Sequence, residues 1–145
     1  MQCIPIRSDL DIVAARVEGR NLAKEIGFDI IDQARIATAI TELARNVVLY
    51  AGVGTVKLRR ISPADVDDEQ GHEARLSGEQ QAGIEVVCED EGPGIRDLEG
   101  ILCDGYAVGR GLGTGLSGTR RLMDEFDIRS EVGVGTSVKV RKWLR

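Results

Sequence analysis

Hydrophobic residues recur with two periods along the 145 residues, and these periods predict both helices and strands. The clearest helical pattern lies between residues 29 and 50, where apolar residues three and four positions apart would form one buried side. They are Ile36, Ile40, Leu43 and Val47. An earlier helix is predicted to open at Ser8, which forms a capping-box pattern with Asp11, and to stop at Gly27. Its apolar side is expected to comprise Leu10, Val13, Val17, Leu22 and Ile26.

Alternation of apolar and polar residues predicts strands at 1–6, 55–61, 83–89, 128–132 and 136–143. In the third of these, Cys88 shares a face with Ile84 and Val86, and it is therefore expected to be a small core residue. A third helix is predicted from Leu116 to Phe126, and the two last strands are expected to form a hairpin. These elements predict an α/β (α+β) two-layer sandwich, with helices laid on one antiparallel or mixed sheet.

Residues 62–82 break this pattern, because they hold six acidic residues and little apolar content. They predict a long polar loop that need not be ordered. The only histidine, His72, lies there, so no catalytic or metal-binding histidine is expected. No linker divides the chain, and its length fits one domain spanning residues 1–145.

The charge balance of 19 basic against 24 acidic residues gives a net charge of −5, which argues against nucleic acid and membrane as main partners. The basic residues near the end, Lys139, Arg141, Lys142 and Arg145, are interpreted as a solvated strand edge. The chain has no apolar run long enough to span a membrane and no signal-peptide pattern. Its three cysteines form no CxxC pair. A cytoplasmic location is expected.

Glu42 and Asn46 are the first candidate functional residues. Four positions apart on a helix, they would be neighbours on a face turned away from the buried stripe. A carboxylate and an amide oxygen can serve Mg²⁺, and the carboxylate could take a proton from a hydroxyl. Taken alone, however, the pair fits a solvated helix face at least as well.

Asp90 follows a predicted strand directly and is itself followed by the sequence Glu-Gly-Pro-Gly. A ligand can approach the backbone closely at Gly92 and Gly94, and Asp90 could accept a hydrogen bond from an exocyclic amine such as that of adenine. A tight turn explains the same residues equally well.

The stretch 109–116 is rich in glycine and precedes the third predicted helix, so its backbone N–H groups could bind an anion. It is not a Walker A loop, because it contains no Gly-Lys-Ser/Thr, and its context does not suit a dinucleotide fold. A last motif, Gly133 to Thr136, reads as a turn into the final strand.

The order and spacing of the four motifs are more specific than any one of them. The chain resembles the GHKL (Bergerat-fold) ATPases and kinases over nearly its whole length. The stretches "ITELARNVVLYAG", "EDEGPGI", "RGLGTGL" and "GTRRLMDEFDI" are, within that superfamily, similar to the serine/threonine switch kinases of the bacterial stressosome. The resemblance implies a Bergerat fold with a mixed sheet covered on one face by helices, and it implies ATP and Mg²⁺ as cofactors.

The same resemblance implies a role for individual residues. Glu42 would support catalysis, Asn46 would bind Mg²⁺, Asp90 would read the adenine amine, and Thr136 would support the adenine pocket. Residues 96–109 would form a lid over the nucleotide. Further nucleotide contacts would come from Gly92, Gly94, Ile95, Arg110, Gly111, Leu112, Gly113, Thr114, Gly115 and Leu116.

The resemblance also implies partners. The kinase would phosphorylate a STAS-domain antagonist or scaffold protein in a stress-response pathway that controls a sigma factor. Once released, it would activate a PP2C-type phosphatase. An anti-sigma factor kinase of the same fold is an alternative. So is an ATP-gated binding module without kinase activity, because Tyr106 precedes Ala-Val-Gly where relatives have a Ser/Thr-rich lid. The catalytic domain of a histidine kinase is disfavoured, since there is no room for a phosphoacceptor helix.

Overall fold

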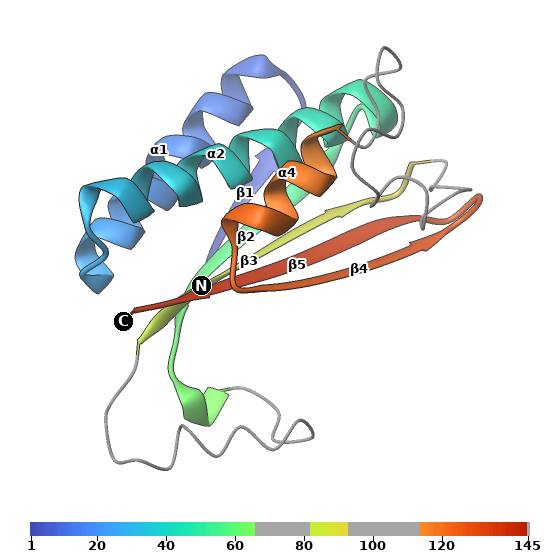
Figure 1. Cartoon of the computed structure of the whole chain (residues 1–145). Coiled ribbons are helices and arrows are strands. Elements are labelled where there is room, and N and C mark those ends of the chain that lie inside the picture. Colours follow the sequence, from blue (N-terminus) through green and yellow to red (C-terminus); the bar gives the residue numbers. More distant parts are fainter. Residues whose placement is uncertain (66–81, 93–113, 145) are drawn as a thin grey trace.

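The computed structural model describes residues 1–65, 82–92 and 114–144. A five-stranded sheet in the order β1-β2-β3-β5-β4 carries α1, α2 and α4 on one of its faces (Figure 1). The strands are β1 (Gln2–Ile6), β2 (Gly54–Ile61), β3 (Gly83–Asp90), β4 (Glu125–Glu131) and β5 (Gly135–Trp143). The helices are α1 (Asp9–Ile26), α2 (Ile30–Asn46) and α4 (Thr114–Leu122), with a π-helical turn at η1 (Val47–Ala51) and a 3-10 turn at η2 (Pro63–Asp65). The two-layer α/β sandwich is confirmed.

The sheet is antiparallel in all four of its described strand pairings, so the expectation of a mixed sheet was wrong for this part of the chain. The connections explain this result. Between β1 and β2, two helices carry the chain away and back, so β2 starts opposite the end of β1, with Gly54 paired to Ile6. β3 and β4 do run in the same direction, but β5 lies between them and is antiparallel to both.

Helix α2 agrees with its predicted pattern. The backbone N–H of Asp32 donates to the Asp29 side chain at 2.7 Å, which caps the first turn. The predicted stripe of Ile36, Ile40, Leu43 and Val47 is buried. The predicted end at Tyr50 needs correction, because α-helical geometry stops at Asn46. The chain then makes the π-helical turn η1, and Gly52, with a φ of 86°, closes it.

Helix α1 buries only part of the predicted side: Ile26 is buried and Leu22 packs against the core, as expected, but the other three residues are exposed. Leu10, Val13 and Val17 are 82%, 46% and 46% exposed. The buried residues of α1 are Ile12, Ala15, Gly19, Ala23 and Ile26. The reason is the close approach of the two helices, since a Cβ atom at Gly19 would overlap the Cδ1 atom of Ile40 on α2. A small residue therefore occupies the contact at Gly19, while Leu10, Val13 and Val17 lie on the exposed side of the helix.

The capping box predicted at Ser8 is also wrong in detail. Ser8 is the N-cap residue, but its side chain makes no capping hydrogen bond. Instead, the carboxylate of Asp11 accepts from the backbone N–H of Arg7 at 2.9 Å, one residue before the cap.

The third helix ends earlier than predicted. It stops at Leu122, and Phe126 belongs to β4, where it pairs with Val140. The chain changes course at Asp124, whose N–H donates to Arg141 O at 2.9 Å. From there, Phe126 and Ile128 pack against the core in the two-residue period of a strand. The predicted hairpin between the last two strands is confirmed.

Two of the basic residues near the chain end are not part of a solvated edge. The Arg141 side chain is 16% exposed and contacts Glu85 at 2.7 Å and Glu125 at 3.3 Å. Arg59 contacts the other oxygen of Glu85 at 2.7 Å. Burial alone would raise the pKa of Glu85, but these two guanidinium groups hold it below its usual value. Lys142 is buried and donates to Leu122 O at 3.0 Å, at the end of α4.

The core lies between the helices and the inner face of the sheet. From the sheet it receives Val56, Leu58, Ile84, Val86 and Cys88, as the alternation predicted. Burial raises the pKa of the Cys88 thiol to about 12, so this cysteine is an inert core residue. In the part of the chain that the structure describes, no helix is long and apolar enough to cross a membrane.

Candidate functional site

The candidate site lies at one end of the sheet, where one row of residues crosses four strands. Gly54, at the start of β2, pairs with Asp90, at the end of β3; Asp90 pairs with Thr136 on β5, and Thr136 pairs with Ser130 on β4. Asp90 and Cys88 are two positions apart in the strand, so Asp90 faces the helical side. The register thus brings Asp90 and Thr136, two of the predicted site residues, side by side.

Local hydrogen bonds orient both side chains. The Oδ1 atom of Asp90 accepts from the backbone N–H of Gly92 at 2.9 Å. The carboxylate is thereby held through one oxygen, and no hydrogen bond joins its other oxygen to another described residue. The Thr136 hydroxyl lies 2.9 Å from that of Ser130, with either group able to donate. Ser130 was not among the predicted site residues, and only the hairpin register could have revealed it.

Two glycines let the chain segments meet at this end. A Cβ atom on Gly135, which has a φ of 147°, would overlap the carbonyl oxygen of Asp90. A Cβ atom on Gly92 would lie 2.6 Å from that of Ala51, in the turn that follows α2. Glycine at these positions therefore allows β5 and the end of α2 to pack directly against the end of β3. The sequence indicated a turn at Gly135, but not this contact.

Glu42 and Asn46 lie on α2, which packs against α4 beside the same sheet end (Figure 1). The Glu42 carboxylate is ion-paired with Arg45 at 3.0 Å, and its side chain is 29% exposed. The Nδ2 atom of Asn46 is buried and has no hydrogen-bond partner among the described residues. A buried amide nitrogen without a partner among the described residues costs stability, so its presence calls for an explanation. Asn46 is also the last residue of the α-helix before a π-helical turn, and such turns are frequent at functional sites. Both features favour a role in ligand binding.

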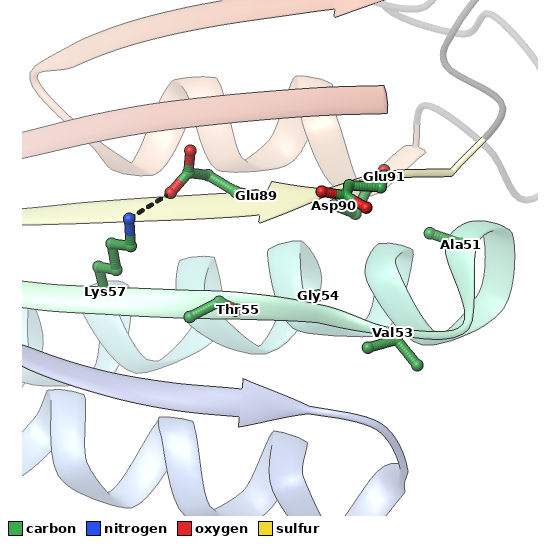
Figure 2. A pocket seen from close by; sticks show the side chains of 8 residues that line it. All are labelled: Ala51, Val53, Gly54, Thr55, Lys57, Glu89, Asp90 and Glu91. Atoms are coloured by element: carbon green, nitrogen blue, oxygen red, sulfur yellow. Dashed lines mark ion pairs between the residues drawn. The ribbon is translucent and has the colours of Figure 1, made fainter. Parts of the chain in front are cut away.

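Two cavities flank the end of β3. One, of about 500 Å³, is lined by residues of η1, β2 and β3 (Figure 2). Figure 2 shows Asp90 and Glu91 facing the turn that carries Ala51, and an ion pair between Lys57 and Glu89 at 2.7 Å. The other, of about 380 Å³, is lined by the neighbouring ends of β3, β5 and β4, with Asp90 and Thr136 among its lining residues. Asp90 therefore borders open space on both sides.

The remaining predicted site residues are only partly covered by the structure. Thr114 and Gly115 form the first turn of α4. Leu116 is buried in the core, which leaves its backbone as the group able to meet a ligand. Gly94, Ile95, Arg110, Gly111, Leu112 and Gly113 lie outside the described residues, as do the proposed lid and His72.

Comparison with known proteins identifies the family. Residues 6–142 match the histidine kinase-like ATPase domain family, and the chain belongs to that family. Within it, the chain belongs with the serine/threonine-protein kinases. It is 46% identical over 143 residues to the serine/threonine-protein kinase RsbT of Bacillus subtilis (strain 168), covering 99% of this chain and 96% of that protein. The resemblance inferred from the motifs is thereby confirmed.

Two solved structures that match this fold are far more distant in sequence. The structure of the SiaB–SiaC complex from Pseudomonas aeruginosa has a chain that matches with a TM-score of 0.55 at 15% identity, covering 99% of this chain and 90% of that one. The mycobacterial sensor histidine kinase MprB matches with a TM-score of 0.53 at 14% identity, covering 98% of this chain and 96% of that one. These likenesses concern the fold alone.

Proposed function

We propose that this chain is a Mg²⁺- and ATP-dependent serine/threonine kinase that phosphorylates a STAS-domain antagonist or scaffold protein in a partner-switching stress response. In this proposal, the kinase released from that protein binds and activates a PP2C-type phosphatase. The cytoplasm is the compartment in which these partners would meet. The observation that carries the kinase proposal is the convergence of Asp90, Thr136 and the Glu42–Asn46 pair at one end of the sheet, in a chain 46% identical to RsbT.

The residues present fit a nucleotide and its metal ion. The free oxygen of Asp90 can accept from the exocyclic amine of adenine, while the missing side chain at Gly92 keeps the approach open. Asn46 has a buried amide nitrogen with no hydrogen-bond partner among the described residues, and the oxygen of such an amide is a ligand type that a hard cation accepts. Bound Mg²⁺ and ATP would supply the phosphoryl group and neutralise charge on its oxygens.

We assign to Glu42 the role of orienting or deprotonating the serine or threonine hydroxyl of the partner protein. Phosphoryl transfer needs positioning more than covalent help from the protein, so one carboxylate within reach of the incoming hydroxyl is sufficient. Arg45, one helical turn away, restrains the Glu42 carboxylate through its 3.0 Å ion pair. Asn46, on the following turn, would keep the metal beside that carboxylate.

Incubation of the purified chain with Mg²⁺, labelled ATP and a STAS-domain protein from the same genome tests this proposal. Label should appear on a serine or threonine of the partner and should be lost with Asn46→Ala. Glu42→Gln should lower the rate by about 100-fold or more while ATP binding persists. Glu25→Gln, an exposed glutamate on α1, is the matched control and should transfer label normally. ATP binding by the wild type without label on the partner would refute kinase activity toward it and favour an ATP-gated binding module.

A further inference from the structure

The hydroxyl groups of Ser130 and Thr136 form a short polar chain at the hairpin end of the candidate site. Thr136 lies two positions before Val138 on β5, and Ser130 lies two positions after Ile128 on β4. Both of these apolar residues pack on the core side of the sheet. Because side chains alternate along a strand, Ser130 and Thr136 also face the helical side, as Asp90 does. The two hydroxyl groups and the Asp90 carboxylate therefore belong to the same wall.

The hydrogen bonds of Ser130 determine the direction of this chain. Its hydroxyl donates to the carbonyl oxygen of Gly135 at 3.3 Å and lies 2.9 Å from the hydroxyl of Thr136. A serine hydroxyl has a single proton, and a carbonyl oxygen can only accept. Both bonds can therefore form together in one arrangement alone, in which Ser130 donates to Gly135 and Thr136 donates to Ser130. The proton of Thr136 then points at Ser130 and away from a ligand.

This direction decides what the wall can recognise. With its proton engaged, the Thr136 oxygen has only lone pairs to offer, so toward a ligand it can only accept. Asp90, its partner in the β3–β5 register, presents a carboxylate, and an ionised carboxylate also only accepts. The two side chains together thus present acceptors and no donor. An N–H group, such as the exocyclic amine of a purine, complements them, whereas a carbonyl oxygen at the same place would face two acceptors.

We propose that Ser130 is a positioning residue for the choice of nucleotide base. By accepting the proton of Thr136, it keeps that hydroxyl an acceptor and selects a 6-amino purine over a 6-oxo purine. The assignment rests on the proposed nucleotide site and adds a residue that acts on selectivity through Thr136. Without the Ser130 hydroxyl, Thr136 can turn its proton toward a carbonyl oxygen, so the repulsive part of the discrimination is lost.

Binding of ATP and of inosine triphosphate (ITP), each with Mg²⁺, tests the proposal on the full chain. The base of ITP carries an oxo group where that of ATP carries the amine. Competition against a fluorescent ATP analogue should show that the wild type prefers ATP by about 100-fold or more. Ser130→Ala should reduce this preference by about tenfold, because ITP gains a hydrogen-bond donor and ATP does not. Ser130→Thr keeps the hydroxyl and suits a strand, so it should restore the preference.

A double-mutant cycle checks that Ser130 acts through Thr136. Thr136→Val removes the hydroxyl that Ser130 orients, so adding Ser130→Ala to it should change the ratio of the ATP and ITP affinities by less than about twofold. Ser137→Ala is the matched control. It makes the same change at the next residue of β5, which faces the other side of the sheet, and it should keep the ratio of the wild type.

The outcomes separate this inference from the proposed function. If the wild type prefers ATP and Ser130→Ala weakens both nucleotides equally, or neither, Ser130 does not act on selectivity and the inference is overturned, while the nucleotide site stands. Equal affinity of the wild type for ATP and ITP overturns it as well, as does a full effect of Ser130→Ala in the Thr136→Val background. If the wild type binds neither nucleotide, the proposed function and the inference both fail.

Discussion

Helices α1 and α2 lie side by side on the same sheet, yet the hydrophobic pattern predicted the buried side of α2 well and that of α1 only at Leu22 and Ile26. In α2 the large apolar residues form the buried stripe. In α1 three of the five buried residues are the small Ala15, Gly19 and Ala23, and the large apolar residues Leu10, Val13 and Val17 are exposed. The difference follows from how closely the helices approach at Gly19 and Ile40.

This comparison shows that a periodic pattern predicts the presence of a helix more reliably than it predicts which side of the helix is buried. An amphipathic helix normally buries its larger apolar residues, because burial of area stabilises the fold. Where two backbones approach closely, small residues must occupy the contact, and the larger ones are free for another role. The following substitutions probe the contrast, from the largest expected effect to the smallest.

Ile40→Ala should be the most damaging change. Ile40 is fully buried and faces Gly19, so truncation removes buried methyl groups and leaves a cavity between the helices. The free energy of unfolding should fall by about 2–5 kcal/mol, measured by urea denaturation. A loss near zero would mean that the two helices do not pack as described.

Gly19→Val tests the same contact from α1. The added side chain would overlap Ile40, which must move, and overpacking of this kind typically costs about 1–3 kcal/mol. The double variant Gly19→Val with Ile40→Val should lose less stability than the sum of the two single variants, because the pair shares one space. Simple additivity in urea denaturation would contradict the close approach.

The two helix starts should respond differently to loss of their cap residues. Asp29→Ala removes the side-chain bond to Asp32 N and should destabilise the protein by about 1 kcal/mol. Ser8→Ala should cost clearly less, since the Ser8 side chain makes no capping bond. Thermal unfolding of both variants beside the wild type measures this difference, and an equal loss would contradict it.

Leu10→Ala should have the smallest effect on stability. The side chain is 82% exposed, so its truncation should change the free energy of unfolding by less than about 0.5 kcal/mol. Leu43→Ala on α2, where the same residue type is 2% exposed, is the matched comparison and should lose several times more. Similar losses in denaturant titrations would show that Leu10 is covered in the folded chain.

The sequence was sufficient for the strands, and it placed Asp90 at the end of one of them. Alternation at Ile84, Val86 and Cys88 identified the inner face of β3, and therefore the side to which Asp90 points. The motifs around Asn46 and Asp90 also led to the correct family, because their order along the chain is far more specific than any one of them. The roles of the individual site residues remain predictions.

Other features depend on contacts that no local pattern encodes. The pairing of Thr136 with Asp90 requires β5 to insert between β3 and β4, and the sequence permits other strand orders. The π-helical turn after Asn46 lies within a stretch whose sequence predicts ordinary helix through Tyr50. Arg141 and Lys142 looked solvated because their acidic and carbonyl partners lie far away in the sequence.

The alternation of β3 also has a consequence for insertions and deletions. A residue inserted early in β3 would move every later residue of the strand by one position. Because Glu89, Asp90 and Glu91 are three acids in a row, Glu89, whose side chain is one methylene longer, would then lie opposite Thr136 in place of Asp90. Cys88 would turn from the core to the other face of the sheet. An inserted residue in the polar stretch before Gly83 shifts nothing in the strand. Natural variation in length should therefore be common between β2 and β3 and nearly absent within β3.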